Sequence, residues 1–155
     1  METHAELQLI YHFANGLHTP LTDDMFIALQ RLTSLLFPGG PPLKKEADPM
    51  LIIITFHHEL MPQTLNIDAI QGFLIDDVSA QVWGPIAWGI LHNAAGGHDC
   101  QRVVSKMLHL FAQLMPCPTC RRHLEVYLEH HPVHMTSYSM QTYVNKLHDA
   151  VNVRL

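Results

Sequence analysis

The sequence predicts a mainly α-helical protein, with a four-helix bundle in the C-terminal half of the chain and a mostly helical N-terminal extension. Three observations support this prediction. Apolar residues recur at intervals of three and four through most of the chain, which is the period of an amphipathic helix. Residues that cap or stop helices stand at the ends of these stretches. Short connections join the last four stretches, as in an antiparallel bundle.

The composition is that of a folded domain. Of the 155 residues, 48% are hydrophobic and only 15% are charged, which favours one packed core over disorder. A net charge of −5, without a lysine-rich block, argues against nucleic-acid binding. Because no apolar run approaches the length of a membrane span, we expect a soluble protein. The thirteen histidines are scattered, so their number alone does not indicate a metal site.

Residues 1–78 form the predicted N-terminal extension, which opens with two helices. Thr3 has the position of a capping-box residue before the first helix, which Gly16 and Pro20 end. The second helix begins after Thr22. The residues expected on the buried sides of these two helices are Leu7, Ile10, Tyr11, Ala14, Leu17, Phe26, Leu29, Leu32, Thr33 and Leu36.

Two further segments of the extension have structural signals but no catalytic pattern. The isoleucine-rich run from Met50 to Phe56 predicts a buried strand, and its periodicity also suits a buried helix. Asn66 is expected to cap another short helix over residues 67–74. The function of the whole extension is not indicated by its sequence.

Residues 79–155 contain the four helices of the predicted bundle. The first helix begins near Trp83-Gly84-Pro85, because proline suits an opening helical turn, and Gly96 and Gly97 end it. Asp99 is expected to cap the second helix. That helix has a broad apolar face, which consists of Val103, Val104, Met107, Leu108, Leu110, Phe111, Leu114 and Met115.

The last two helices of the bundle have equally clear ends. The third runs from Pro118 toward His130 and is stopped by Pro132. The fourth begins near Ser137 or Ser139, either of which can serve as its cap. The chain contains no internal repeat that would suggest another architecture.

A Cys-x-x-Cys motif, formed by Cys117 and Cys120, opens the third bundle helix. Cys117 fits the N-cap position, and Pro118 fits the first helical position, where a missing N–H costs nothing. Free backbone N–H groups, the positive end of the helix dipole and the nearby Arg121 and Arg122 all favour a thiolate. The spacing suits a redox pair, half of a zinc site, or two inert core thiols.

Aromatic and polar residues in the bundle add a second signal. Trp88 and His92 lie one turn apart on the first bundle helix, and His148 and Asn152 lie one turn apart on the last. Taken singly, each suits ordinary packing or a helix surface. Together with a reactive dithiol, they supply the apolar walls, stacking rings and polar edges that a flat aromatic cofactor needs.

With these residues, the sequence from Trp83 to Leu155 resembles the Erv/ALR family of FAD-linked sulfhydryl oxidases. The resemblance covers about half of the chain and is highly specific when its three blocks are taken together. These blocks are Trp83–His92, His109-Leu110-Phe111 through Cys117-Pro118-Thr119-Cys120, and Tyr143–Asn152.

The resemblance implies a FAD-dependent sulfhydryl oxidase that forms disulfides in protein substrates. Electrons would pass from substrate thiols through Cys117 and Cys120 to FAD, and then to dioxygen to give hydrogen peroxide. The implied partners are a thiol-containing protein substrate or a small redox carrier. A second copy of the chain is also implied, in a homodimer built on the first two bundle helices, where the broad apolar face of the second helix exceeds the needs of one core.

The resemblance also implies a role for individual residues. Cys120 would face the flavin, and Cys117 would exchange with substrate thiols. Trp88 and His92 would line the cofactor from the first helix. The other residues implied at the cofactor are Trp83, Gly84, Tyr143 in place of the usual tryptophan, His148 and Asn152 at the adenine and ribose, and Arg154 near the phosphates.

Several departures from the family pattern affect these expectations. Pro85 stands where family members often have Gly-Arg, and Asp149 replaces a common asparagine, so the FAD affinity is in question rather than the activity. The sequence has no second Cys-x-x-Cys to act as a shuttle. This compact form is more similar to the virus-encoded branch than to the mitochondrial one, which implies the host cytoplasm or the virion, with the mitochondrial intermembrane space as the alternative.

Two other classes of protein compete with the oxidase. A thioredoxin-like protein would place its dithiol after a strand, whereas residues 103–115 predict a helix. A non-enzymatic zinc module would need four ligands at characteristic spacings, and a histidine three residues after the second cysteine fits poorly. The ligands open to such a module are Cys117, Cys120 and two of His123, His130, His131 and His134. The remaining cysteine, Cys100, is expected to be dispensable.

Overall fold

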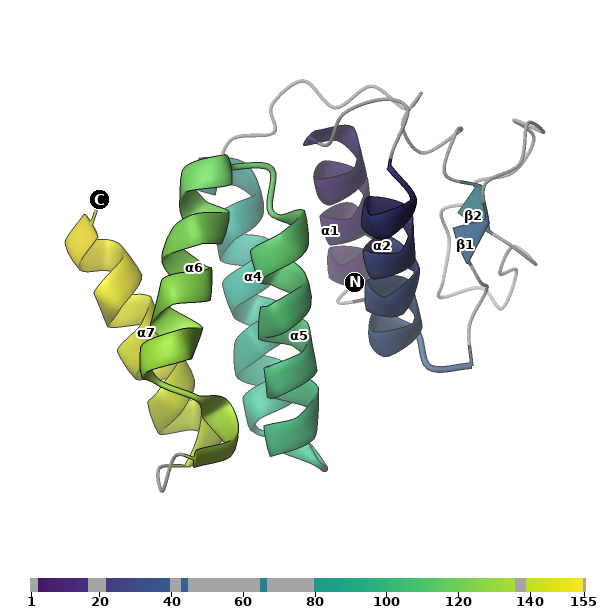
Figure 1. Ribbon diagram of the computed structural model, residues 1–155. Helices are drawn as coiled ribbons and strands as arrows, with labels where there is room; N and C mark the ends of the chain where they lie inside the picture. Colours follow the sequence, from purple (N-terminus) through teal and green to yellow (C-terminus); the bar gives the residue numbers. More distant parts are fainter. Residues whose placement is uncertain are drawn as a thin grey trace.

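Helices make up most of the part of the chain that the structure describes. The structure is a computed structural model that describes residues 3–16, 22–39, 43–44, 65–66, 80–135 and 139–154. The C-terminal bundle consists of α4 (Ala80–Ala95), α5 (Cys100–Leu114), α6 (Pro118–His130) and α7 (Met140–Arg154), with the short 3₁₀ helix η1 (Val133–Met135) before α7 (Figure 1). The N-terminal helices are α1 (Thr3–Gly16) and α2 (Asp23–Leu36). The predicted mainly α-helical fold is therefore confirmed.

Two very short strands lie between α2 and α4 in the chain. The strand β1 (Leu43–Lys44) pairs in parallel with β2 (Leu65–Asn66), so that Leu43 is opposite Leu65. Asn66, which was expected to cap a helix, is the last residue of β2. The strand predicted over residues 50–56 and the helix predicted over residues 67–74 lie outside the described residues.

Three of the predicted helix caps are formed by side chains. The Thr22 hydroxyl accepts a hydrogen bond from the Met25 N–H at 3.2 Å and caps α2. The Ser139 hydroxyl accepts one from the Thr142 N–H at 3.2 Å at the start of α7. The third cap, at α6, involves the cysteine pair described below. Each cap satisfies an N–H group that has no partner inside the helix.

The start of α4 differs from the prediction. The helix begins at Ala80, so Pro85 lies inside it rather than in its opening turn. Proline has no N–H, and the carbonyl of Gln81 therefore lacks the intrahelical partner that residue 85 would normally supply. Since Pro85 is exposed, water can satisfy that carbonyl, and the helix continues through the proline.

The predicted side-chain cap at Asp99 is wrong. Asp99 occupies the N-cap position of α5, as predicted, but its backbone is left-handed, with φ of 55°, and its side chain makes no capping hydrogen bond. Its carboxylate instead accepts a hydrogen bond from Arg102 Nε, one turn into the helix. This exposed ion pair holds the pKa of Asp99 below its usual range, because the arginine stabilises the charged carboxylate.

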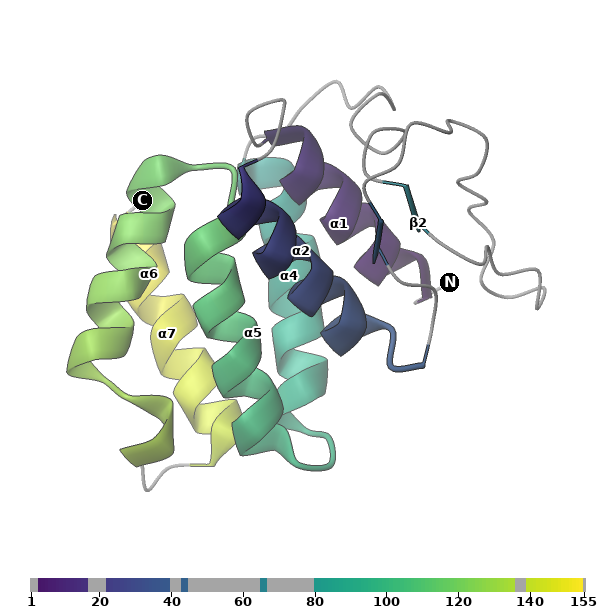
Figure 2. The same cartoon turned by 45° about the vertical axis from the view of Figure 1, so that its right-hand side comes forward.

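The N-terminal helices pack directly against the bundle. Figures 1 and 2 show α4 and α5 between the α1–α2 pair on one side and α6 and α7 on the other. The α1 helix contacts α4, and α2 contacts α5. Their buried residues join the same hydrophobic cluster as those of the bundle. The fully buried members from α1 and α2 are Leu7, Leu9, Ile10, Phe13, Ala14, Leu29 and Leu32.

This packing bears on the predicted homodimer. The apolar breadth of α5 suggested that a second chain covers it, but α2 of the same chain packs along α5. That surface is therefore not the free apolar face from which the dimer was argued. None of the described helices is long and apolar enough to cross a bilayer.

Candidate functional site

The two cysteines of the motif form a disulfide at the start of α6. Their Cα atoms are 5.2 Å apart, and Cys117 is the N-cap of the helix, as predicted. The Cys117 Sγ atom accepts a hydrogen bond from the Cys120 N–H at 3.1 Å. The Cys117 carbonyl accepts another from the Arg121 N–H at 2.9 Å. The sulfur atoms thus lie among the free N–H groups of the first helical turn, where a thiolate is stabilised.

A tight turn holds the residues that lead into the disulfide. The Met115 carbonyl accepts a hydrogen bond from the Cys117 N–H at 2.7 Å. The Arg121 side chain reaches back to the same carbonyl, with its Nη1 atom at 2.7 Å. A charged donor therefore ties this turn to α6. Arg121 is half-buried, whereas Arg122 is exposed.

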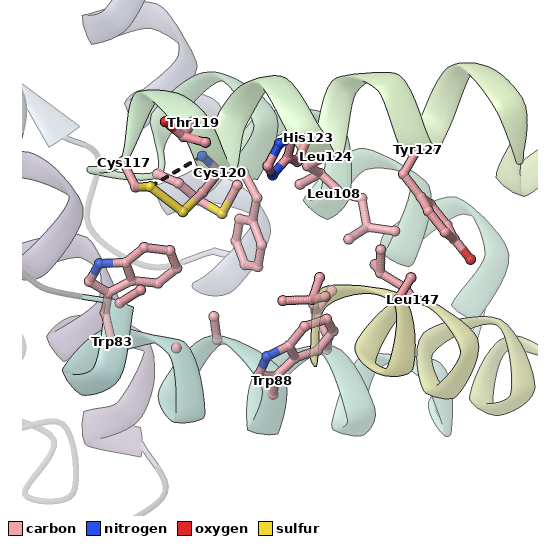
Figure 3. Close-up of a pocket in the computed structure, with 18 residues that line it drawn as sticks. Trp83, Trp88, Leu108, Cys117, Thr119, Cys120, His123, Leu124, Tyr127 and Leu147 are labelled. Carbon is pink, nitrogen blue, oxygen red and sulfur yellow. Dashed lines mark hydrogen bonds between the residues drawn. A yellow bond between two sulfur atoms is a disulfide. The ribbon is translucent and has the colours of Figure 1, made fainter. Parts of the chain in front are cut away.

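The disulfide lies in the wall of an apolar cavity between the four bundle helices. The cavity has a volume of about 300 Å³. Figure 3 shows the disulfide and Trp83 at one end of it, with Trp88 farther along α4. The lining residues are mostly apolar: Ala80, Trp83, Gly84, Ala87, Trp88, Leu91, Leu108, Phe111, Met115, Cys117, Thr119, Cys120, His123, Leu124, Tyr127, Leu147, Ala150 and Val151.

Five of the residues predicted for the site line this cavity together. They are Cys117 and Cys120 at the start of α6, and Trp83, Gly84 and Trp88 on α4. A Cβ atom built at Gly84 would meet no atom within 4 Å. The absent side chain therefore leaves open space on the cavity side of α4, beside a buried tryptophan.

The predicted histidines stand beside Trp88 rather than in the cavity lining. The His148 ring stacks on the Trp88 ring, with centroids 4.0 Å apart and planes 16° from parallel. The His92 ring is 6.0 Å from that of His148. Gln141 binds His92 twice: its Nε2 donates to the His92 carbonyl at 3.0 Å, and its Oε1 lies 3.3 Å from Nδ1. Since an amide oxygen can only accept, this arrangement places a proton on Nδ1.

Tyr143 is buried behind the cavity and does not line it. Its side chain is 2% exposed, and its hydroxyl donates to the His131 carbonyl. The Tyr143 ring meets the edge of Tyr127, which does line the cavity, at 6.3 Å and 80°. Burial raises the pKa of the Tyr143 hydroxyl to about 12, with a smaller contribution from Tyr127, because the anion loses its hydration.

We expect this tyrosine to make the protein sensitive to alkali. The folded state keeps the Tyr143 proton up to about pH 12, whereas the unfolded chain releases it near its ordinary pKa of about 10. The free energy of unfolding should therefore fall between about pH 10 and 12. Replacing Tyr143 with Phe should flatten that fall and cost about 1 kcal/mol at neutral pH, through the lost hydrogen bond. Urea denaturation of the parent and the variant from pH 7 to 11.5 would measure the loss of stability at neutral pH and the fall at high pH. If the free energy of unfolding of the variant fell as steeply above pH 10 as that of the parent, Tyr143 would not be the cause of the alkali sensitivity.

Two predicted residues have no described side chain. Asn152 and Arg154 belong to α7, but their side chains lie outside the described part of the structure. Asp149, which raised a question about FAD affinity, is exposed and does not line the cavity.

Three polar residues of the lining were not among those predicted at the cofactor. These are Thr119, His123 and Tyr127, all on α6. His123 and Tyr127 follow Cys120 at intervals of three and four, which places them on the same side of the helix. Their spacing could have predicted them from the sequence, because the residues one turn after a cavity residue on the same helix tend to line the cavity too.

One of the comparisons with known proteins finds a match, and it covers one part of the chain. No curated protein and no solved structure matches the sequence. The model of the Erv1 / Alr family matches residues 86–155, which is just under half of the 155 residues. The matched segment contains Trp88, the cysteine pair and all of α5, α6 and α7. The helical bundle over residues 86–155 is therefore similar to the Erv1 / Alr family.

Proposed function

We propose that the protein is a FAD-dependent sulfhydryl oxidase that forms disulfides in protein substrates. The observation that carries this proposal is the disulfide Cys117–Cys120 in the wall of an apolar cavity flanked by Trp83 and Trp88. The match to the Erv1 / Alr family model suggests the same activity, because that family is generally one of thiol oxidases and its members are typically flavin-linked.

The residues around the cavity fit a flat aromatic cofactor. The volume of about 300 Å³ lies at the lower end of the range for small-molecule sites, and suits a ring system more than a whole dinucleotide. The open space at Gly84 and the apolar walls would accept the flavin rings beside the disulfide. The stacked rings of Trp88 and His148 offer a surface for the rest of the molecule. We propose that His92, Asn152 and Arg154 also contact the part of FAD that lies beside Trp88 and His148.

The chain's own chemistry follows the rules of thiol–disulfide exchange. A substrate thiolate attacks Cys117 Sγ, the Cys117–Cys120 bond breaks, and Cys120 leaves as a thiolate stabilised by the start of α6. The second substrate thiol then displaces Cys117 and completes the substrate disulfide. Two electrons and two protons now reside on the cysteine pair. The chemistry supplied by a bound FAD is acceptance of these electrons and their transfer to dioxygen, which gives hydrogen peroxide.

We also propose that the two parts of the chain have different roles. Residues 79–155 carry the oxidase chemistry, and residues 1–78 form the N-terminal extension whose helices α1 and α2 support it. The partners are thiol-containing proteins or a small redox carrier. The homodimer and a virus-related location remain predictions from the family resemblance, and sedimentation of the full chain tests the first.

Visible absorption and thermal melting of the purified protein test the proposal. We expect a yellow protein with a flavin spectrum. FAD at a hundredfold excess over its dissociation constant should stabilise the fold by about 2.7 kcal/mol, which raises the melting temperature by roughly 5–10 °C for a chain of this size. Riboflavin serves as the control ligand, since it lacks the adenine end. Equal melting temperatures with and without FAD would contradict the proposal.

The zinc-module alternative makes a different prediction. Among the residues that the structure describes, no group of three or more His, Cys, Asp or Glu side chains lies close enough to hold a metal ion. The two cysteines are joined to each other, and a zinc site needs them as separate thiolates. A colourless protein that retains stoichiometric zinc after reduction would favour this alternative over the oxidase.

A further inference from the structure

The buried ring of Phe13, on α1, contacts two aromatic residues of the cavity wall. Its side chain is fully buried. Its centroid lies 5.4 Å from that of Trp83, with the planes at 84°, and 5.5 Å from that of Phe111, at 86°. Both are edge-to-face pairs in the favoured range of separation. Trp83 and Phe111 belong to different helices, α4 and α5, and both line the cavity.

These contacts lie at the end of the cavity that holds the disulfide. Figure 3 shows Trp83 on the α4 side of the cavity, facing the Cys117–Cys120 bond. Phe111 is one turn before Met115 on α5, and the Met115 carbonyl anchors the turn that leads to Cys117. Phe13 therefore stands behind the aromatic wall nearest to the reactive sulfur atoms.

The first turns of α4 need such support from outside the helix. Trp83 lies in a segment in which Pro85 cannot donate to the Gln81 carbonyl, so backbone hydrogen bonding holds this segment less firmly than a regular helix. The α1 helix packs against α4. The Phe13 ring packs against Trp83 and so restricts the rotamer of the tryptophan.

We propose that Phe13 is a positioning residue of the redox site, and that α1 thereby completes the flavin cavity. The inference rests on the proposed function, because the wall matters only if a flat cofactor occupies the cavity. It assigns a role to the N-terminal segment, which lies outside the part of the chain that matches the family. The flavin affinity of the bundle then depends on a residue about seventy positions before its first helix begins.

The test uses the full chain with Phe13→Leu and Phe13→Met, which remove the ring and keep an apolar side chain. We expect the dissociation constant for FAD, measured by quenching of flavin fluorescence, to rise by about tenfold, because a Trp83 ring that Phe13 no longer holds must be ordered when the flavin binds, which costs up to roughly one decade of affinity. Without flavin, the near-ultraviolet circular dichroism of tryptophan should weaken in both variants, while the far-ultraviolet spectrum stays helical.

Val133→Ala is the matched control for lost core packing. Val133 is 2% exposed and packs against α5 through η1. Its carbonyl accepts from Gln101 Nε2 at 3.1 Å, near the start of α5 and far along that helix from Phe111. This variant should lower the melting temperature but keep the parent's FAD affinity and tryptophan signal.

Two results would overturn the inference. One is an FAD affinity in both Phe13 variants equal to that of Val133→Ala. The other is loss of the helical fold in both, since Phe13 would then support the whole core. A parent chain that binds no FAD would refute the proposed function separately. The near-ultraviolet circular dichroism of tryptophan in the flavin-free protein would then test whether Phe13 positions Trp83. An unchanged tryptophan signal in Phe13→Met would show that it does not.

Discussion

Replacing both Cys117 and Cys120 with serine should reduce dithiothreitol oxidation to the rate without protein. The hydroxyl of serine cannot form the mixed disulfide through which substrate electrons enter, and no other cysteine lines the cavity. The single variants should differ. Cys120→Ser should keep FAD but pass it no electrons. Cys117→Ser should leave Cys120 as a thiolate near the flavin, which a long-wavelength charge-transfer absorption would report.

Cys100→Ser is the control for the cysteine variants. Cys100 is a free, half-buried thiol at the first position of α5, and it does not line the cavity. We expect this variant to turn over small dithiols and protein substrates at the parent rate. Oxygen consumption and thiol titration would measure both activities. Normal turnover by the double serine variant would refute the assignment of the cysteine pair, and a slow Cys100→Ser variant would make that thiol part of the electron path.

A chain cut before α4, with residues 80–155 alone, should form larger assemblies than the full chain at the same concentration. Removing α1 and α2 uncovers the surfaces of α4 and α5 that they cover. Fully burying a Leu, Ile or Phe side chain stabilises a fold by about 1.5–3 kcal/mol, and the two N-terminal helices contribute several of these, including Leu9, Phe13 and Leu29. The exposed apolar surface should therefore bind the same surface of another copy of the fragment.

Sedimentation velocity and thermal melting would check this prediction. The matched control adds a peptide of residues 1–39 to the fragment, which should reduce the assembly size and raise the melting temperature if the peptide docks in trans. A control peptide with Leu9, Phe13 and Leu29 replaced by serine should do neither. A fragment that has the assembly state and melting temperature of the full chain would show that α1 and α2 are dispensable for the fold.

The sequence by itself determined the helices of the bundle and the local geometry of the cysteine pair. Cys117 at the N-cap, Pro118 at the next position and the Cys120 N–H bonded to the Cys117 sulfur all involve residues within one turn. Such contacts are set by local geometry, so the spacing of the residues is enough to predict them. The caps at Thr22 and Ser139 were predictable for the same reason.

Predictions from local sequence patterns were wrong in part at the starts of α4 and α5. Pro85 suggested an opening turn, but α4 continues five residues earlier, to Ala80. The residues before a proline can extend a helix when the unpaired carbonyl faces water. Asp99 does occupy the N-cap position of α5, yet with a left-handed backbone and a carboxylate paired with Arg102 its side chain makes no capping hydrogen bond. In both places the backbone conformation, rather than the residue type, decided the outcome.

Only the tertiary structure decided what surrounds the disulfide. Phe13 lies 70 positions before Trp83 and 98 before Phe111 in the chain, yet it packs on both. Trp88 stacks on His148 from the last helix. Such contacts depend on how each helix is rotated and on which neighbour covers it. A helical period reveals that a face is apolar but not which helix will bury it, and for this reason the sequence predicted a second chain on the surface of α5 that α2 occupies.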